Sequence, residues 1–304
     1  MATSRTKKDS AKKAESKDIV VAGLGDVASA SAPEFMQKGK QGLEALGRDD
    51  IEMAWIKLIQ ATTPGLQQND WTPGNFVHSI TGTQITGKGE GKESAEKGFF
   101  MTPVLILPPR YMLFNPIDQG GGILARAEDG VNWSPANADF KVKIYKGSKE
   151  VTWSTKPTVQ ESGLANFGTF DPDDPKSLPA ADLQYRYVCY IHGHPEWGPV
   201  VIMMQKSAIK AAKRINAILD GSGYPSYSHI IHLDSRWEEK SGDDKKFVWV
   251  PTASGFVNDE ELYKSFVSLH ERYADEEIVM HDEDKAGEQE FDKKAPVDAE
   301  NAEY

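Results

Sequence analysis

Short runs of β-branched and aromatic residues, separated by glycine, proline, asparagine and aspartate, recur along most of this chain of 304 residues. Such runs are typical of strands, and the breakers between them are typical of turns. The pattern therefore predicts a loop-rich β protein rather than a helical bundle. The clearest candidate strands are DFKVKIY (139–145), EVTWST (150–155), LQYRYVCYI (183–191), PVVIMMQ (199–205), HIIHLDSRW (229–237) and KFVWVPTA (246–253).

Three segments before residue 115 add to this pattern. The segment NFVHSITGTQIT (75–86) predicts a strand, a Thr-Gly turn and a second strand. The long apolar segment FFMTPVLILPPRYMLF (99–114) contains three prolines, which favour an edge strand or a bend over a central strand. Residues 52–60 suit either a strand or a helix, because their apolar residues fit both periods.

Two segments have the spacing of amphipathic helices. SAIKAAKRINAIL begins at Ser207 and keeps most of its basic residues off one apolar face. That face consists of Ile209, Ala212, Ile215 and Leu219. The second helix is expected to open at Asn258, with Glu261 completing a capping box. Its apolar stripe consists of Leu262, Phe266, Leu269 and Tyr273.

The net charge of -11 is unevenly distributed along the chain. The first 18 residues hold 6 basic and 3 acidic residues, whereas residues 275–304 hold 12 acidic and 3 basic residues, a net charge of -9. The 256 residues between them carry 26 basic and 31 acidic residues. Both ends also lack hydrophobic periodicity. We therefore expect a disordered basic arm at residues 1–32, a β-rich body at 33–275 and a disordered acidic tail at 276–304.

Enzyme motifs are missing from the sequence. The chain has no G-x-x-x-x-G-K-[ST], no G-x-S-x-G and no H-E-x-x-H. Gly120 to Gly122 is not followed by a helix pattern, so it predicts a turn rather than a phosphate-binding loop. No run approaches the roughly 18 apolar residues of a membrane span. We expect a protein that is not an enzyme, uses no cofactor and does not enter a membrane.

Metal-ligating residue types gather in one part of the chain. They are Cys189, His192 and His194, with His229 and His232 as another pair. Zinc accepts such ligands, and three of them would leave an open catalytic position. The intervening Gly193 and Pro195 instead favour a turn between two strands, and no fourth ligand stands at a zinc-site spacing. A single cysteine also excludes an internal disulfide and every CxxC motif. We expect no metal.

Basic residues alternate with aromatic residues on several strand candidates. Between Lys141 and Tyr145, strand geometry puts Lys141, Lys143 and Tyr145 on one face, opposite Val142 and Ile144. Single-strand binders need these two residue types, because cations contact phosphates and rings stack on bases at roughly 1 to 3 kcal/mol each. Tryptophan and tyrosine are also common core residues, so each pair has a structural interpretation as well.

From about Gly42 to Asp275 the chain resembles a group of tailed-bacteriophage proteins labelled as single-stranded DNA-binding proteins. The resemblance rests on IKLIQATTPGLQ, WTPGNFVHSITG, GGGILARAEDGVNW, TVQESGLANFGTFDPDDP and QKSAIKAAKRINAIL. The acidic end at Tyr304 is similar to the tails that often accompany OB-type barrels in such proteins, although it lacks the bacterial Asp-Asp-Asp-Ile-Pro-Phe ending. The resemblance implies an α+β, β-rich fold with an OB-like antiparallel barrel, two or three short helices and disordered termini.

These observations together favour a non-catalytic single-stranded DNA-binding protein that acts in phage DNA replication or recombination in the host cytoplasm. Its acidic tail is the expected contact for replication or recombination proteins. A structural or assembly protein of the virion is the main alternative, and a zinc enzyme is the third. The expected DNA-binding residues are Lys141, Lys143, Tyr145, Trp153, Arg186 and Trp249, with Lys206, Lys210, Lys213 and Arg214 as flanking phosphate contacts.

Overall fold

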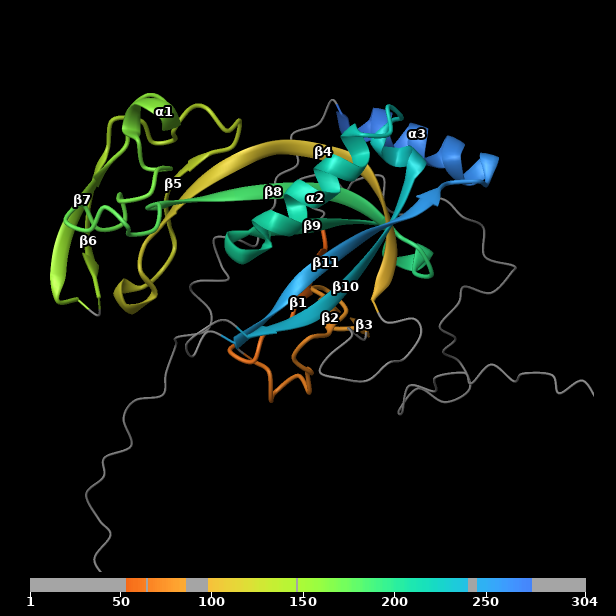
Figure 1. Ribbon diagram of the computed structural model, residues 1–304, viewed down its shortest axis with the longest axis horizontal. Coiled ribbons are helices and arrows are strands. Elements are labelled where there is room, and N and C mark those ends of the chain that lie inside the picture. Colours follow the sequence, from red (N-terminus) through yellow and green to blue (C-terminus); the bar gives the residue numbers. More distant parts are fainter. Residues whose placement is uncertain (1–52, 64, 86–97, 146, 240–244, 275–304) are drawn as a thin grey trace, which may run out of the picture. The chain divides into compact units, whose positions relative to one another are not determined.

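The computed structural model describes residues 53–63, 65–85, 98–145, 147–239 and 245–274, which form a nine-stranded sheet and a two-stranded sheet (Figure 1). The predicted arm at residues 1–32 and the predicted tail at residues 276–304 lie outside these ranges, as do residues 33–52 of the predicted body. The described residues all belong to one compact unit of the chain, Glu52–Tyr304.

The nine-stranded sheet is curled into a half barrel, and its strands do not follow chain order. Its main path runs through β11 (Lys245–Phe256), β10 (His229–Glu239), β4 (Phe99–Phe114), β8 (Ala181–Ile191), β9 (Pro199–Gln205), β1 (Trp55–Leu58), β2 (Phe76–His78) and β3 (Gln84–Ile85), and β5 (Ile123–Ala127) pairs with β4. The β-rich α+β class is confirmed. The expectation of a purely antiparallel barrel is wrong at one place, because β1 runs parallel to β9.

Of the two expectations for the proline-rich strand β4, an edge strand or a bend, the first is wrong, because β4 lies between β10 and β8 in the sheet. It pairs with β8 from Met101 to Leu113, while its other side pairs with β10 and β5 only near its two ends. The three prolines lie in the stretch between those two pairings, and the register with β8 shifts twice there. Because proline has no N–H to donate, it is tolerated where ladder hydrogen bonds are interrupted.

The larger core lies between one face of the curled sheet and the helix α2 (Ile209–Asp220), which contacts β8, β9 and β11 (Figure 1). The predicted apolar face of this helix is confirmed, since Ala212, Ile215 and Leu219 are buried and Ile209 is half-buried. Beneath it lie apolar side chains of the sheet. They include Ile56, Phe76, Met101, Cys189, Ile202, Met204 and Leu233.

A second, smaller core lies under the two-stranded sheet of β6 (Asp139–Ile144) and β7 (Lys149–Ser154). Residues with period-2 spacing fill it from both strands, as the alternating pattern predicts for β6. They are Val142, Ile144, Val151 and Trp153. The short helix α1 (Val159–Ser162), which the sequence reading did not anticipate, closes this core and begins with a capping box of Thr158 and Glu161.

The remaining helical elements are short apart from α3 (Glu260–Ala274). They are the 3₁₀ turns η3 (Ile117–Gln119), η4 (Pro195–Trp197), η5 (Lys206–Ala208) and η6 (Ser226–Ser228). The expected cap of α3 is wrong by one residue, because the Asp259 carboxylate, not Asn258, accepts from the Leu262 N–H at 3.0 Å. No helix within the described ranges is long and apolar enough to span a membrane.

Two glutamine side chains form hydrogen bonds with the backbone of a strand, on the side where no other described strand pairs with it. The Gln60 amide donates to the Phe247 carbonyl at 3.0 Å and accepts from the Phe247 N–H at 2.9 Å, so it bridges the end of β1 to β11. The Gln119 amide makes the same two contacts with the backbone of Lys143 on β6. A primary amide matches the spacing of one backbone N–H and C=O, and each glutamine therefore acts as a single rung of a ladder.

We predict that Gln60→Ala lowers the free energy of unfolding by roughly 1 to 3 kcal/mol, because it leaves the polar backbone groups of buried Phe247 without their partner. Denaturant unfolding measures this. The exposed Gln68 is the matched control, and Gln68→Ala should change stability by less than about 0.5 kcal/mol. Equal stability of the two variants would show that the bridge contributes nothing.

Candidate nucleic-acid interface

The two lysines of the β6 hairpin face solvent, as the alternating pattern predicts. Lys141 and Lys143 are exposed, while Val142 and Ile144 are buried. Their strand partners are Thr152 and Glu150, so the exposed face carries both signs of charge rather than only positive charge. Tyr145 is exposed but lies just beyond the strand, with a φ of 52°. This surface offers two cations and one aromatic ring.

Two of the predicted stacking residues pack into the cores instead. Trp153 is 2% exposed in the smaller core, and its indole N–H donates to the Phe170 carbonyl at 3.4 Å. Trp249 is partly buried against the larger core, with its ring 4.9 Å from the ring of Phe76. A base cannot stack on a ring that the protein already covers on its faces. Trp153 is therefore not part of the candidate interface, and the half-buried Trp249 has only part of its ring exposed.

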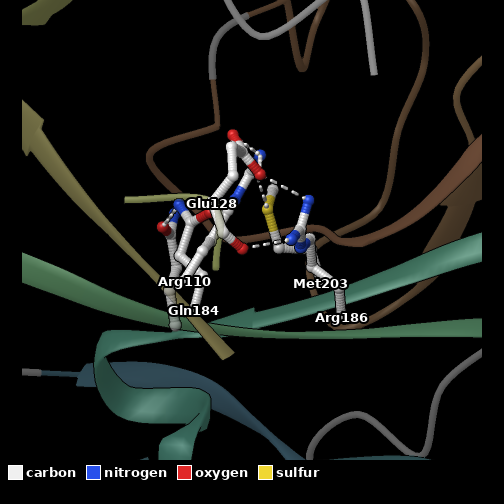
Figure 2. A network of polar contacts seen from close by, with 6 residues as sticks. Arg110, Glu128, Gln184, Arg186 and Met203 are labelled. Atoms are coloured by element: carbon white, nitrogen blue, oxygen red, sulfur yellow. Dashed lines mark hydrogen bonds and ion pairs between the residues drawn. The ribbon is translucent and has the colours of Figure 1, made fainter. Parts of the chain in front are cut away.

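Arg186 is also unavailable to phosphate, because it is 5% exposed and belongs to a polar network (Figure 2). Its guanidinium lies 2.9 Å from one carboxylate oxygen of Glu128, and the guanidinium of the buried Arg110 lies 3.0 Å from the other. Arg110 also donates from Nε to Gln184 at 2.7 Å. The network ties the turn after β5 to β4 and β8, and its buried charges are paired, as buried charges must be. Arg186 is therefore a structural residue.

The cationic side of α2 is the part of the predicted site that remains intact. Lys210, Lys213 and Arg214 are all exposed, and their i, i+3 and i+4 spacing puts them on one stripe. The buried residues of α2 lie on the opposite side of the helix. Lys206, in the turn before the helix, is exposed and forms an ion pair with Asp182 at 3.1 Å. The helix therefore presents a continuous positive stripe away from the sheet.

A buried tyrosine fixes the position of this helix. Tyr187 on β8 is fully buried, and its hydroxyl donates to Asn216 Oδ1 at 2.8 Å. The carbonyl oxygen of Ala212 lies 3.1 Å from the same hydroxyl. Burial raises the pKa of the Tyr187 hydroxyl, so the group stays a neutral donor. Because the contact is made on the buried side of the helix, it holds the stripe of lysines outward.

Sequence reasoning missed two exposed aromatic residues near the end of α2. Tyr224 follows the helix in a Gly-Ser-Gly-Tyr-Pro loop, and Phe256 ends β11. They are 64% and 52% exposed, and their ring centroids are 5.4 Å apart. The sequence held one signal for them. Each of these large aromatic residues stands beside a turn-forming glycine, outside an alternating apolar run that would predict its burial.

The candidate metal ligands lie in different surroundings. Cys189 is fully buried in the larger core, where burial raises the pKa of its thiol. His192 lies with Nε2 2.8 Å from Thr102 Oγ1, and His194 stacks on Trp197 at 3.9 Å. Within the residues that the structure describes, no three His, Cys, Asp or Glu side chains are arranged to hold a metal ion. Cys189 is thus a core residue of the sheet.

Two histidines are held in the neutral form. Burial lowers the pKa of His192, and burial together with the nearby His194 lowers the pKa of His78. The backbone N–H of Thr81 donates to Nδ1 of His78 at 3.2 Å, so the ring proton of the neutral form resides on Nε2. Protonation of either ring would place a positive charge in a poorly hydrated environment.

Comparison with known proteins gives one match. A family model described as Pam3 phage gp34-like protein matches residues 25–279. The chain belongs to this Pam3 phage gp34-like family. The match confirms the phage part of the resemblance, while the DNA-binding part stays a prediction. The search of curated proteins found no match, and the search of solved structures found none either.

The lowered pKa values predict an acid-sensitive fold. Because the unfolded chain binds protons more readily at His78 and His192, the unfolding free energy should fall as pH drops below about 6.5. Above about pH 7.5 the protonation of these two histidines should no longer affect the free energy of unfolding. Urea unfolding at pH 7.5, 6.5 and 5.5 measures the slope. The double variant His78→Gln/His192→Gln should have a shallower slope, and an unchanged slope would contradict the assignment.

Proposed function

We propose that this phage protein binds single-stranded DNA without catalysing a reaction, in the host cytoplasm during DNA replication or recombination. The observation that carries the proposal is the cationic stripe of α2 on a chain whose net charge is -11. Lys210, Lys213 and Arg214 lie together on one exposed side of the helix. Cations at this spacing contact successive phosphates of a flexible strand.

The curled sheet supports the same proposal in a general way. OB barrels are partly open barrels that bind nucleic acid across their strands. The half barrel here has nine strands, and the Gln60 bridge brings β1 and β11 together at one end. We propose an OB-like use of this sheet, with α2 beside it as the phosphate contact. Lys141, Lys143 and Tyr145 on the hairpin are proposed as a second, weaker contact.

One observation favours the alternative of a virion structural or assembly protein. Phe167 and Leu178 are 72% and 67% exposed, and both belong to the loop between α1 and β8. Hydrogen bonds between Gly168 N–H and the Ser177 carbonyl, and between Phe170 N–H and the Leu178 carbonyl, bring the two sides of this loop together. Exposed apolar residues that lie close together are typical of protein contacts.

The charge on α2 gives the decisive test. The variant Lys210→Glu/Lys213→Glu should bind a single-stranded oligonucleotide at least tenfold more weakly at low salt, because two phosphate contacts become repulsive. The slope of log affinity against log salt should become shallower by roughly 1.4, at about 0.7 per phosphate lost. Fluorescence titration across a salt series measures both quantities.

A matched control separates this local effect from a change in net charge. Lys156→Glu/Lys176→Glu makes the same charge change on exposed loop lysines and should bind within about twofold of the wild type. Lys141→Glu/Lys143→Glu tests the hairpin and should have an intermediate effect. Wild-type protein that does not bind single strands, or that binds duplex equally well, would exclude the proposal and favour the virion alternative.

The acidic segment 276–304 is proposed to compete with DNA for the cationic stripe and to contact replication or recombination proteins. It holds 11 acidic and 3 basic residues, so its deletion removes a net charge of -8 and changes the charge of the chain from -11 to -3. A tethered polyanion stays at high effective concentration near a cationic site, and salt screens this competition.

Deletion of residues 276–304 should therefore strengthen single-strand binding at low salt, and the difference should disappear at high salt. The melting transition should be unchanged, because the segment contains few apolar residues. Binding titrations of both proteins at low and high salt, with thermal melts alongside, make the comparison. Unchanged or weaker binding at low salt would show that the segment does not compete.

A further inference from the structure

We propose that Tyr224, Phe256 and His229 form a subsite for one nucleobase at the end of the cationic stripe. This inference rests on the proposed function and adds to it the place where a base, rather than a phosphate, is bound. Tyr224 and Phe256 are both more than half exposed, and their rings meet edge to face with centroids 5.4 Å apart. A flat heterocycle can stack on either ring without any rearrangement of the core.

A buried histidine beside Phe256 distinguishes this pair from other exposed aromatic residues. His229 is 3% exposed, and its ring centroid lies 5.0 Å from that of Phe256. Its Nδ1 lies 3.1 Å from the Pro225 carbonyl. A carbonyl oxygen only accepts, so Nδ1 carries the proton and Nε2 is left as an acceptor. This Nε2 is buried and has no hydrogen-bond partner in the structure.

A buried acceptor without a donor is unfavourable, and beside the two exposed rings a ligand can supply that donor. Nucleobases combine the two required features, namely an aromatic face and ring or exocyclic N–H groups. A base that stacks on Phe256 and shifts its side chain outward can donate an N–H to Nε2 of His229. A purely apolar partner would cover the rings but leave the acceptor unsatisfied.

The subsite lies within reach of a strand bound along α2. Asp220 lies six residues after Arg214 on the helix, a rise of about 9 Å, and Tyr224 follows four residues later, at most about 14 Å further. A few nucleotides span this distance. After Phe256 the nearest acidic residue is Asp259, whose carboxylate accepts from the Leu262 N–H at 3.0 Å. Glu260 and Glu261 follow it and pair with Lys264 at 2.8 Å and 3.0 Å.

The test uses the full-length protein and a 12-nucleotide single strand with 2-aminopurine at one position, whose fluorescence is quenched when it stacks. Tyr224→Ala and Phe256→Ala should each weaken binding by about 5- to 150-fold and reduce the quenching. Phe167→Ala is the matched control, because Phe167 is an exposed aromatic residue on a different loop. It should retain wild-type affinity and quenching. Thermal melts verify that each variant is folded.

A second oligonucleotide, abasic at every position, separates stacking from phosphate binding. Wild type and both aromatic variants should bind it equally, since no base is present to stack. If the wild type binds single strands but Tyr224→Ala and Phe256→Ala behave like Phe167→Ala, the subsite is refuted while the proposed function stands. If the wild type binds no single strand at all, the proposed function itself is refuted, and the subsite with it.

Discussion

The antiparallel pairing of β4 with β8 is the interaction on which the rest of this structure depends. The two strands pair from Met101 to Leu113 and from Ala181 to Ile191, and both cores are built on them. At one end Met101 and Cys189 lie under α2, while at the other Leu113 and Ala181 support the smaller core. Loss of this pairing would separate the half barrel from the hairpin. The pairing of β4 with β8 also positions the buried arginines that hold the turn after β5.

Neutral side-chain amides finish the sheet where strands end. Gln60 and Gln119 each pair with one backbone residue, and Gln84 accepts from the Thr72 N–H and donates to the Asp70 carbonyl. An amide satisfies a backbone N–H and C=O without the desolvation cost of a buried charge. Because these contacts end the pairing in a defined way, they protect strand ends that would otherwise offer unpaired polar groups to other chains.

Positive charge is used in two distinct ways. Arg110 and Arg186 are buried and paired with Glu128, so they stabilise the joint between β4, β8 and the turn after β5. Lys210, Lys213 and Arg214 are exposed on a helix whose opposite side is anchored by Tyr187. Only the second group can attract a polyanion from solution. Basic residues on strands therefore fall into both groups, since Arg186 is buried while Lys141 and Lys143 are exposed, whereas the three basic residues of α2 are all exposed.

The sequence by itself determined the β-rich class, the hairpin alternation of Lys141 and Lys143 against Val142 and Ile144, and the two-sided character of α2, because these follow from local periodicity. Only the tertiary structure decided the strand order, the parallel contact of β1 with β9 and the central place of the proline-rich β4. It also decided that Trp153 and Arg186 are buried and Trp249 is half-buried, while Tyr224 and Phe256 are exposed. Periodicity tells which residues share a face of a strand, but whether that face is covered depends on segments distant in the chain, and this is a long-range property of packing.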